Sequence, residues 1–189
     1  STSWEYDARG RVFRETKSIA GWRLASQAST DRVWVYDSMD RVAEAIVDDA
    51  DGFYYQYDAS GRLYQVRRLG NEQVTLFYNA LGQVTERRLG YQAGMPYPEL
   101  RQTFTYPIAQ NFRLTSLRSG YSPNYNNLQN ISYTYDGAGN VLTIADSVAN
   151  GGSQTQTFTY DALNRLLAAR ATGGSNGAYG QRSYGYNNA

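Results

Sequence analysis

Aspartates recur along this 189-residue chain, each directly after a tyrosine and most of them four residues before an arginine. A row of carboxylates could support acid–base catalysis, because a carboxyl group can give or take a proton. An aspartate that opens a tight turn, however, accepts hydrogen bonds from the backbone two residues further on. Turn formation explains every position, so we interpret these aspartates as structural. They are Asp7, Asp37, Asp58, Asp136 and Asp161.

The arginines that follow are placed to form ion pairs with the aspartates across the mouth of each turn. Exposed pairs of this kind typically contribute only about 0–1 kcal/mol to folding. The sequence therefore predicts a local structural role for them, at Arg11, Arg41, Arg62 and Arg165.

Nucleophilic and zinc chemistry lack their usual residues, because the chain has no histidine and no cysteine. This removes the Ser-His and Cys-His pairs and the common zinc ligands. Asp48, Asp49 and Asp51 form an acidic cluster that could bind Ca²⁺ through oxygen ligands. The cluster lacks the twelve-residue calcium-loop pattern, so a solvated turn is the preferred interpretation. We expect neither enzymatic activity nor a cofactor or metal site.

The aspartates belong to a longer pattern that begins with a tyrosine and ends six residues later with Val or Leu. Successive copies begin 21 to 30 residues apart, and such a period indicates a stacked repeat architecture. The copy at Tyr106 is looser and reaches Arg113-Leu114 two residues late, and the copy at Tyr186 is incomplete. The tyrosines are Tyr6, Tyr36, Tyr57, Tyr78, Tyr106, Tyr135, Tyr160 and Tyr186.

The residue two positions before each tyrosine is usually aromatic, and the residue between them is mostly polar or small. Alternation with a period of two is typical of a β-strand with one buried face. We therefore expect these rings to lie on the same buried face as the tyrosines, with Phe104–Tyr106 and Phe158–Tyr160 as the best test pairs. The preceding residues are Trp4, Trp34, Tyr55, Leu76, Phe104, Tyr133, Phe158 and Tyr184.

The residues after each tyrosine are typical of a tight turn. An aspartate opens most copies, and Asn79 takes its place in one. Four positions after the tyrosine stand residue types that tolerate a positive φ, as the residue that closes a type I turn requires. These are Gly10, Asp40, Gly61, Gly82, Gly139 and Asn164. Each repeat is thus predicted to be a β-hairpin, and the chain an all-β array of stacked antiparallel hairpins that form a curved sheet.

The remaining composition limits the partners. A net charge of +1 provides no general attraction for nucleic acid, and no run of about 18 apolar residues could form a membrane-spanning helix. Variation in repeat length falls in segments rich in Gly, Ser, Asn and Pro, which are typical of loops. These segments are 91–100, 119–130, 146–155 and 172–181.

The repeats closely resemble the tyrosine–aspartate (YD) repeats of the Rhs family, most clearly at Tyr57–Leu63, Tyr135–Val141 and Tyr160–Leu166. This family includes bacterial Rhs toxins, shell-forming components of insecticidal toxin complexes, wall-associated proteins and animal teneurins. The resemblance implies a β-sheet that spirals into a hollow shell, which in the toxins encloses a C-terminal effector. The chain has no Asp-Pro-x-Gly-Leu element of the kind that carries self-cleavage in the toxin shells.

We therefore expect residues 1–189 to be an array of about eight hairpin repeats, the first and last incomplete, from a larger protein. The expected function is that of a structural, non-enzymatic wall segment of a secreted or cell-surface bacterial protein. Its partners would be further repeats, adjacent domains, copies of itself or an enclosed effector.

Two alternatives remain open. One is an adhesin or glycan-binding module that uses the loop aromatics Tyr91, Tyr97, Tyr121 and Tyr125. The other is a filament of chains stacked end to end, which the absence of polar caps on the terminal hairpins would favour.

Overall fold

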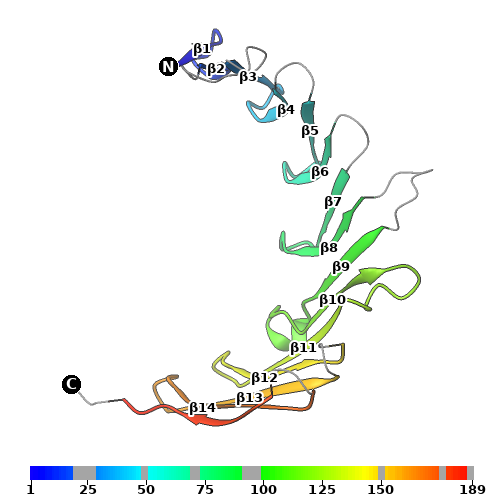
Figure 1. Cartoon of the computed structure of the whole chain (residues 1–189), viewed down its shortest axis with the longest axis vertical. Coiled ribbons are helices and arrows are strands. Elements are labelled where there is room, and N and C mark those ends of the chain that lie inside the picture. Colours follow the sequence, from blue (N-terminus) through cyan, green and yellow to red (C-terminus); the bar gives the residue numbers. More distant parts are fainter. Residues whose placement is uncertain are drawn as a thin grey trace. The chain divides into compact units, whose positions relative to one another are not determined.

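The computed structural model describes residues 1–18, 29–47, 51–68, 73–90, 99–148, 152–174 and 178–186. Within these ranges the chain forms fifteen β-strands and one short 3-10 helix. Strand order in the sheet follows chain order from the first strand to the last (Figure 1). All strand pairs with a determined register are antiparallel, which confirms the predicted all-β hairpin architecture.

The strands have the following bounds. The first eight are β1 (Thr2–Tyr6), β2 (Val12–Ser18), β3 (Ser29–Tyr36), β4 (Val42–Val47), β5 (Asp51–Tyr57), β6 (Leu63–Arg68), β7 (Gln73–Tyr78) and β8 (Val84–Leu89). The others are β9 (Leu100–Thr105), β10 (Ser116–Tyr121), β11 (Gln129–Tyr135), β12 (Val141–Asp146), β13 (Gln154–Tyr160), β14 (Leu166–Thr172) and β15 (Tyr179–Ser183).

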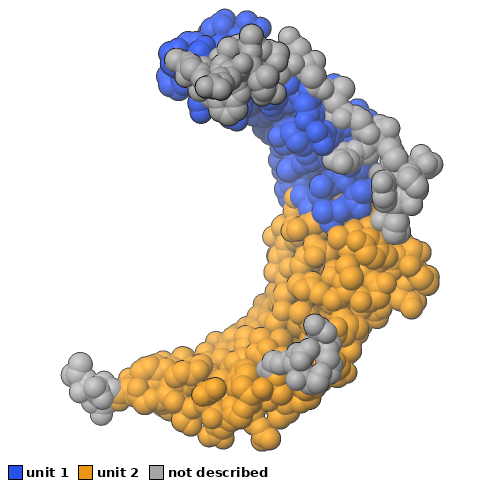
Figure 2. All heavy atoms as spheres, in the orientation of Figure 1, with its two compact units in different colours: residues 1–76, 89–97 blue, residues 77–88, 98–189 orange. Residues whose placement is uncertain are grey.

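The chain divides into two compact units, coloured blue and orange in Figure 2. Unit 1 contains residues 1–76 and 89–97, and unit 2 contains residues 77–88 and 98–189. Because consecutive strands run in opposite directions, the tyrosine–aspartate turns within one unit lie at the same end of its strands. The connections between hairpins lie at the opposite end (Figure 1).

The repeat turns have the predicted conformation. The backbone N–H of Gly61 donates to the carbonyl of Asp58 at 2.9 Å, and Gly61 closes the turn with φ of +80°. Positive φ is also found where the sequence lacks glycine, at Asp40 (61°) and Asn164 (62°). Gly10, Gly82 and Gly139 complete the set, so the predicted left-handed position is confirmed.

A β-bulge follows five of these turns, at a position on the second strand that the sequence analysis did not anticipate. In the first hairpin Tyr6 pairs with Val12, but Glu5 pairs with Arg14, so Phe13 is an extra residue on the second strand. The same register shift occurs at Tyr36, Tyr57, Tyr135 and Tyr160. A bulge bends the strand and increases its twist. These five repeats therefore carry the same local bend at the same place.

The looser copy at Tyr106 accommodates its two additional residues in a single helical turn. The 3-10 helix η2 (Ile108–Gln110) follows Pro107, and Asn111 and Phe112 both take positive φ. The next strand, β10, then begins only at Ser116.

The predicted aromatic face exists but is not a closed core. Phe104, Tyr106, Phe158 and Tyr160 are half-buried, and the threonines between them are exposed, which confirms the alternation. The face is only partly covered, because the only enclosed apolar residues in the described part of the chain are two alanines of β14. The described strands form one layer, and no second layer of these residues covers the rings. Trp4 and Tyr6 are even more than half exposed, at 53% and 60%.

Candidate functional site

Each turn aspartate uses one carboxylate oxygen to accept hydrogen bonds from two backbone N–H groups. One oxygen of Asp37 accepts from the backbone N–H groups of Met39 at 2.9 Å and Arg41 at 3.0 Å. The corresponding pair of bonds is made at Asp7, Asp58, Asn79 and Asp161, and a similar pair at Asp136. These carboxylates therefore hold the turn closed, as the structural interpretation required.

The second carboxylate oxygen binds the arginine four residues later. Asp37 Oδ2 lies 2.8 Å from Nε and 2.6 Å from Nη2 of Arg41, which is a forked ion pair. The predicted pairs of Asp7–Arg11, Asp58–Arg62 and Asp161–Arg165 are also present. Amides replace them in two copies, where Asn140 donates to Asp136 and Asn79 donates to Gln83, both at 2.8 Å.

The electrostatics favour the charged form of each carboxyl. The Arg11 side chain lowers the pKa of Asp7 below its usual 3.8, because it donates to the carboxylate. Arg41 and Arg62 lower the pKa of Asp37 and Asp58 in the same way. The Asn140 side chain lowers the pKa of Asp136, and the backbone N–H of Arg165 is the largest cause of the lowered pKa of Asp161. An acid catalyst needs a raised pKa, so these shifts argue against that role.

The arginine then reaches the tyrosine of the next repeat. The guanidinium carbon of Arg41 lies 4.1 Å from the centre of the Tyr57 ring, close enough for a cation–π contact. The Tyr57 hydroxyl donates to the carbonyl of Val42, the residue after the arginine, at 2.8 Å. We call this set of turn aspartate, arginine and next tyrosine the Asp–Arg–Tyr clamp.

The clamp recurs in both units. Arg11 lies 4.3 Å from the Tyr36 ring, and Arg165 lies 4.5 Å from the Tyr186 ring. The hydroxyl bond to the preceding repeat is made by Tyr36 to Val12, Tyr135 to Leu114, Tyr160 to Val141 and Tyr186 to Leu166, at 2.6 to 3.0 Å. Tyr106 is an exception, since its hydroxyl has no hydrogen bond within the described ranges, and burial raises its pKa. Tyr6 ends β1 and Tyr78 ends β7 in the same position.

The left-handed turn residue also contacts the preceding repeat. The carboxylate of Asp40 forms ion pairs with Arg9 and Arg11, and the Asn164 side chain accepts from Asn140 at 2.8 Å. At Gly139 an added Cβ would lie only 2.7 Å from the Arg113 guanidinium. Glycine here provides room for the neighbouring arginine as well as a positive φ.

Sequence reasoning missed these contacts between repeats, although one signal pointed to them. The position two residues before the repeat tyrosine varies between Trp, Tyr, Phe and Leu, whereas the first position of every copy is tyrosine. A phenylalanine would serve an apolar face equally well. The recurrence of tyrosine therefore indicates that the hydroxyl itself has a partner.

The connection between β10 and β11 spans 122–128, shorter than the predicted 119–130, and its Tyr125 belongs to a second, unpredicted cluster. The Arg101 guanidinium lies 4.0 Å from the centre of the Tyr125 ring and forms ion pairs with Glu86 at 3.3 Å and Glu99 at 2.8 Å. One face of Tyr125 is thus occupied, while Tyr121 is 37% exposed. The other loop aromatics proposed for glycan binding, Tyr91 and Tyr97, lie outside the described residues.

The acidic cluster gives no metal site in the part of the chain that can be assessed. Asp48 and Asp49 lie outside the described residues, and Asp51 forms an ion pair with Arg68 at 2.8 Å. No group of three or more potential ligand side chains comes together among the described residues. None of the described helical segments has the length and apolar character that crossing a membrane would require.

Comparison with known proteins identifies the fold. No protein-family model matches the chain, and no curated protein matches it. Crystal structures do match, namely TcdB2-TccC3-Cdc42 (18% identity, TM-score 0.69) and TcdB2-TccC3 (18% identity, TM-score 0.68). A third is TcdB2-TccC3 without its hypervariable C-terminal region (19% identity, TM-score 0.67). Each match covers 89% of this chain and 9% of the other, so the chain spans less than a tenth of their length. The Rhs-like repeat fold expected from the sequence is confirmed.

Proposed function

We propose that this chain is a non-enzymatic wall segment of a secreted or cell-surface shell protein. The observation that carries the proposal is the Asp–Arg–Tyr clamp, which joins one repeat to the next at the same place in both units. In repeat proteins, stability is approximately the sum of the repeats and the interfaces between neighbours. A wall requires a contact that can be repeated, and the clamp supplies it.

The side chains that could have carried catalysis support the same proposal. The turn carboxylates are bound by backbone N–H groups and by arginine or asparagine side chains, and their pKa values are lowered. These carboxylates therefore serve to close the turns that join consecutive strands. The fold shared with the TcdB2-TccC3 structures is consistent with a wall that encloses a cargo segment of a longer polypeptide.

The test uses the longest natural protein that contains this chain, examined by electron microscopy and limited proteolysis. We expect hollow closed particles and a segment that resists digestion while the particle is intact. Combined Tyr57→Phe and Tyr135→Phe substitutions, which remove two clamp hydroxyls, should make that segment digest faster. The matched substitutions Tyr55→Phe and Tyr133→Phe should not. Particles without an interior, or equal digestion of both variants, would reject the wall.

The alternatives predict different outcomes of the same experiments. Filaments in the micrographs would favour end-to-end assembly of chains. Binding on a glycan array that is lost on Tyr121→Ala would favour an adhesin that uses this exposed aromatic at the end of β10.

A further inference from the structure

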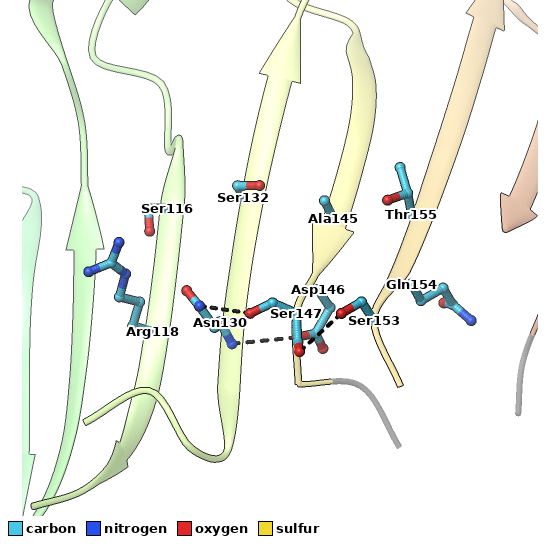
Figure 3. A pocket seen from close by; sticks show the side chains of 10 residues that line it. All are labelled: Ser116, Arg118, Asn130, Ser132, Ala145, Asp146, Ser147, Ser153, Gln154 and Thr155. Atoms are coloured by element: carbon cyan, nitrogen blue, oxygen red, sulfur yellow. Dashed lines mark hydrogen bonds between the residues drawn. The ribbon is translucent and has the colours of Figure 1, made fainter. Parts of the chain in front are cut away.

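A polar hollow of about 220 Å³ lies on unit 2, across strands β10 to β13 (Figure 3). Its lining includes Ser116 and Arg118 of β10, Asn130 and Ser132 of β11, Asp146 at the end of β12 and Thr155 of β13. Register explains why these side chains meet, since Arg118 pairs with Asn130 and Ser116 pairs with Ser132. At about 30 Å³ per water molecule, the volume corresponds to about seven waters. That is room for a small polar group and too little for a large ligand.

The hollow contains donors and acceptors that the fold itself does not use. The hydroxyls of Ser116, Ser132 and Thr155 have no hydrogen-bond partner among the described residues, and the Arg118 guanidinium has no carboxylate partner there. This contrasts with the arginines of the clamps, which are paired and stacked. Ser116 and Ser132 pair on neighbouring strands about 4.8 Å apart, and Ala145 of β12 lies between Ser132 and Thr155.

The polar groups on the β11–β12 side are held in place. The Asn130 side chain donates to the Ser147 hydroxyl at 2.7 Å (Figure 3), and Asp146 accepts from the backbone N–H of Val148 at 3.0 Å. Asp146 thereby presents a fixed carboxylate acceptor at the hollow. The same carboxylate oxygen also accepts from the backbone N–H of Asn130 at 3.5 Å, so among the described lining residues Arg118 carries the charge that has no protein partner. A single guanidinium suits a ligand with a single carboxylate, and the neighbouring hydroxyls suit a ligand with several hydroxyl groups.

The remaining lining excludes apolar ligands. Ala145 is the only apolar residue among those labelled in Figure 3, and no aromatic ring lines the hollow. Recognition must then depend on hydrogen bonds and on the planar fork of Arg118, which matches a carboxylate in two parallel bonds. We propose that the hollow binds a uronic acid residue of an acidic polysaccharide. The carboxylate is held by Arg118, and the sugar hydroxyls are held by Asn130, Asp146 and the hydroxyls of Ser116 and Ser132.

The experiment measures binding of trigalacturonate and of neutral galactotriose to the chain by isothermal titration calorimetry. Loss of one charge-assisted hydrogen-bonded contact corresponds to a change of about tenfold in affinity at an exposed site. We therefore expect trigalacturonate to bind about tenfold more tightly, and Arg118→Gln to remove that preference. Arg170→Gln is the matched control, because Arg170 is also an exposed arginine of unit 2, on β14, and does not line the hollow.

Each other outcome overturns the proposal. Absence of trigalacturonate binding would reject the site. Equal weakening by Arg118→Gln and Arg170→Gln would show diffuse attraction to positive charge. Inorganic phosphate competing as well as the uronate would reject the ligand class. Thermal melts of both variants verify that each is folded, and the exposure of both side chains leads us to expect unchanged melting temperatures.

Discussion

Removal of one clamp hydroxyl tests the central structural argument. In Tyr135→Phe the ring remains, but its 2.6 Å hydrogen bond to the Leu114 carbonyl is lost. A typical intramolecular hydrogen bond contributes about 0.5–1.5 kcal/mol net. The aromatic face is only half-buried, so water can replace the phenol at the carbonyl, and we expect about 1 kcal/mol. For a chain of this size that corresponds to a melting temperature lower by about 2–4 °C.

The chain provides a control on the same strand. Tyr133 lies two residues earlier on the same face, and its hydroxyl has no hydrogen bond within the described ranges, so Tyr133→Phe should leave the melting temperature unchanged. Unit 1 offers the same comparison, with Tyr57→Phe destabilising and Tyr55→Phe neutral. The assay is thermal and urea unfolding monitored by circular dichroism. If clamp and control variants unfold together, the hydroxyl bond does not stabilise the repeat junction.

Three further predictions concern the turns. Gly82→Ala should lower the free energy of unfolding in urea by about 1–2 kcal/mol, because its φ of +80° disfavours any residue with a Cβ. An added Cβ would meet no atom within 4 Å, so this cost is conformational and not steric. Gly137→Ala, outside the left-handed region, should cost less, and equal costs would contradict the turn geometry. Arg41→Lys should lower the melting temperature more than Arg87→Lys, because lysine cannot form the fork on Asp37 or stack as a plane on Tyr57, and the opposite order would refute the clamp. The free energy of unfolding should fall as the pH decreases below about 4, because the turn carboxyls have a lower pKa in the folded chain than the 3.8 of the unfolded chain. Their stabilising contribution is complete above pH 3.8 and is lost as the pH falls through the folded pKa. A chain equally stable at pH 3 and pH 7 would disprove this.

The aromatic face shows where prediction from sequence succeeded and where it failed. The alternation at Phe158, Thr159 and Tyr160 predicted which residues share a face, because side chains of a strand alternate strictly. The degree to which the face is covered could not be predicted, because it depends on whether a second layer packs on the face. No pattern along one strand carries that information. The described residues provide a single layer, so the rings remain half-exposed.

The sequence by itself determined the hairpin turns, since the interactions that close each turn lie within a few residues. The aspartate of a turn binds backbone groups two and four positions later, and the residue that closes the turn is recognised by its tolerance of a positive φ. The tertiary structure alone decided how repeats are joined. The tyrosine hydroxyl and its carbonyl partner are 15 residues apart at Tyr57 but 24 apart at Tyr36. Strand pairing brings them together in space whatever the length of the intervening loop, so the variable sequence spacing conceals a constant contact. The polar hollow arises in the same way, from the register of four strands and from no motif in any one of them.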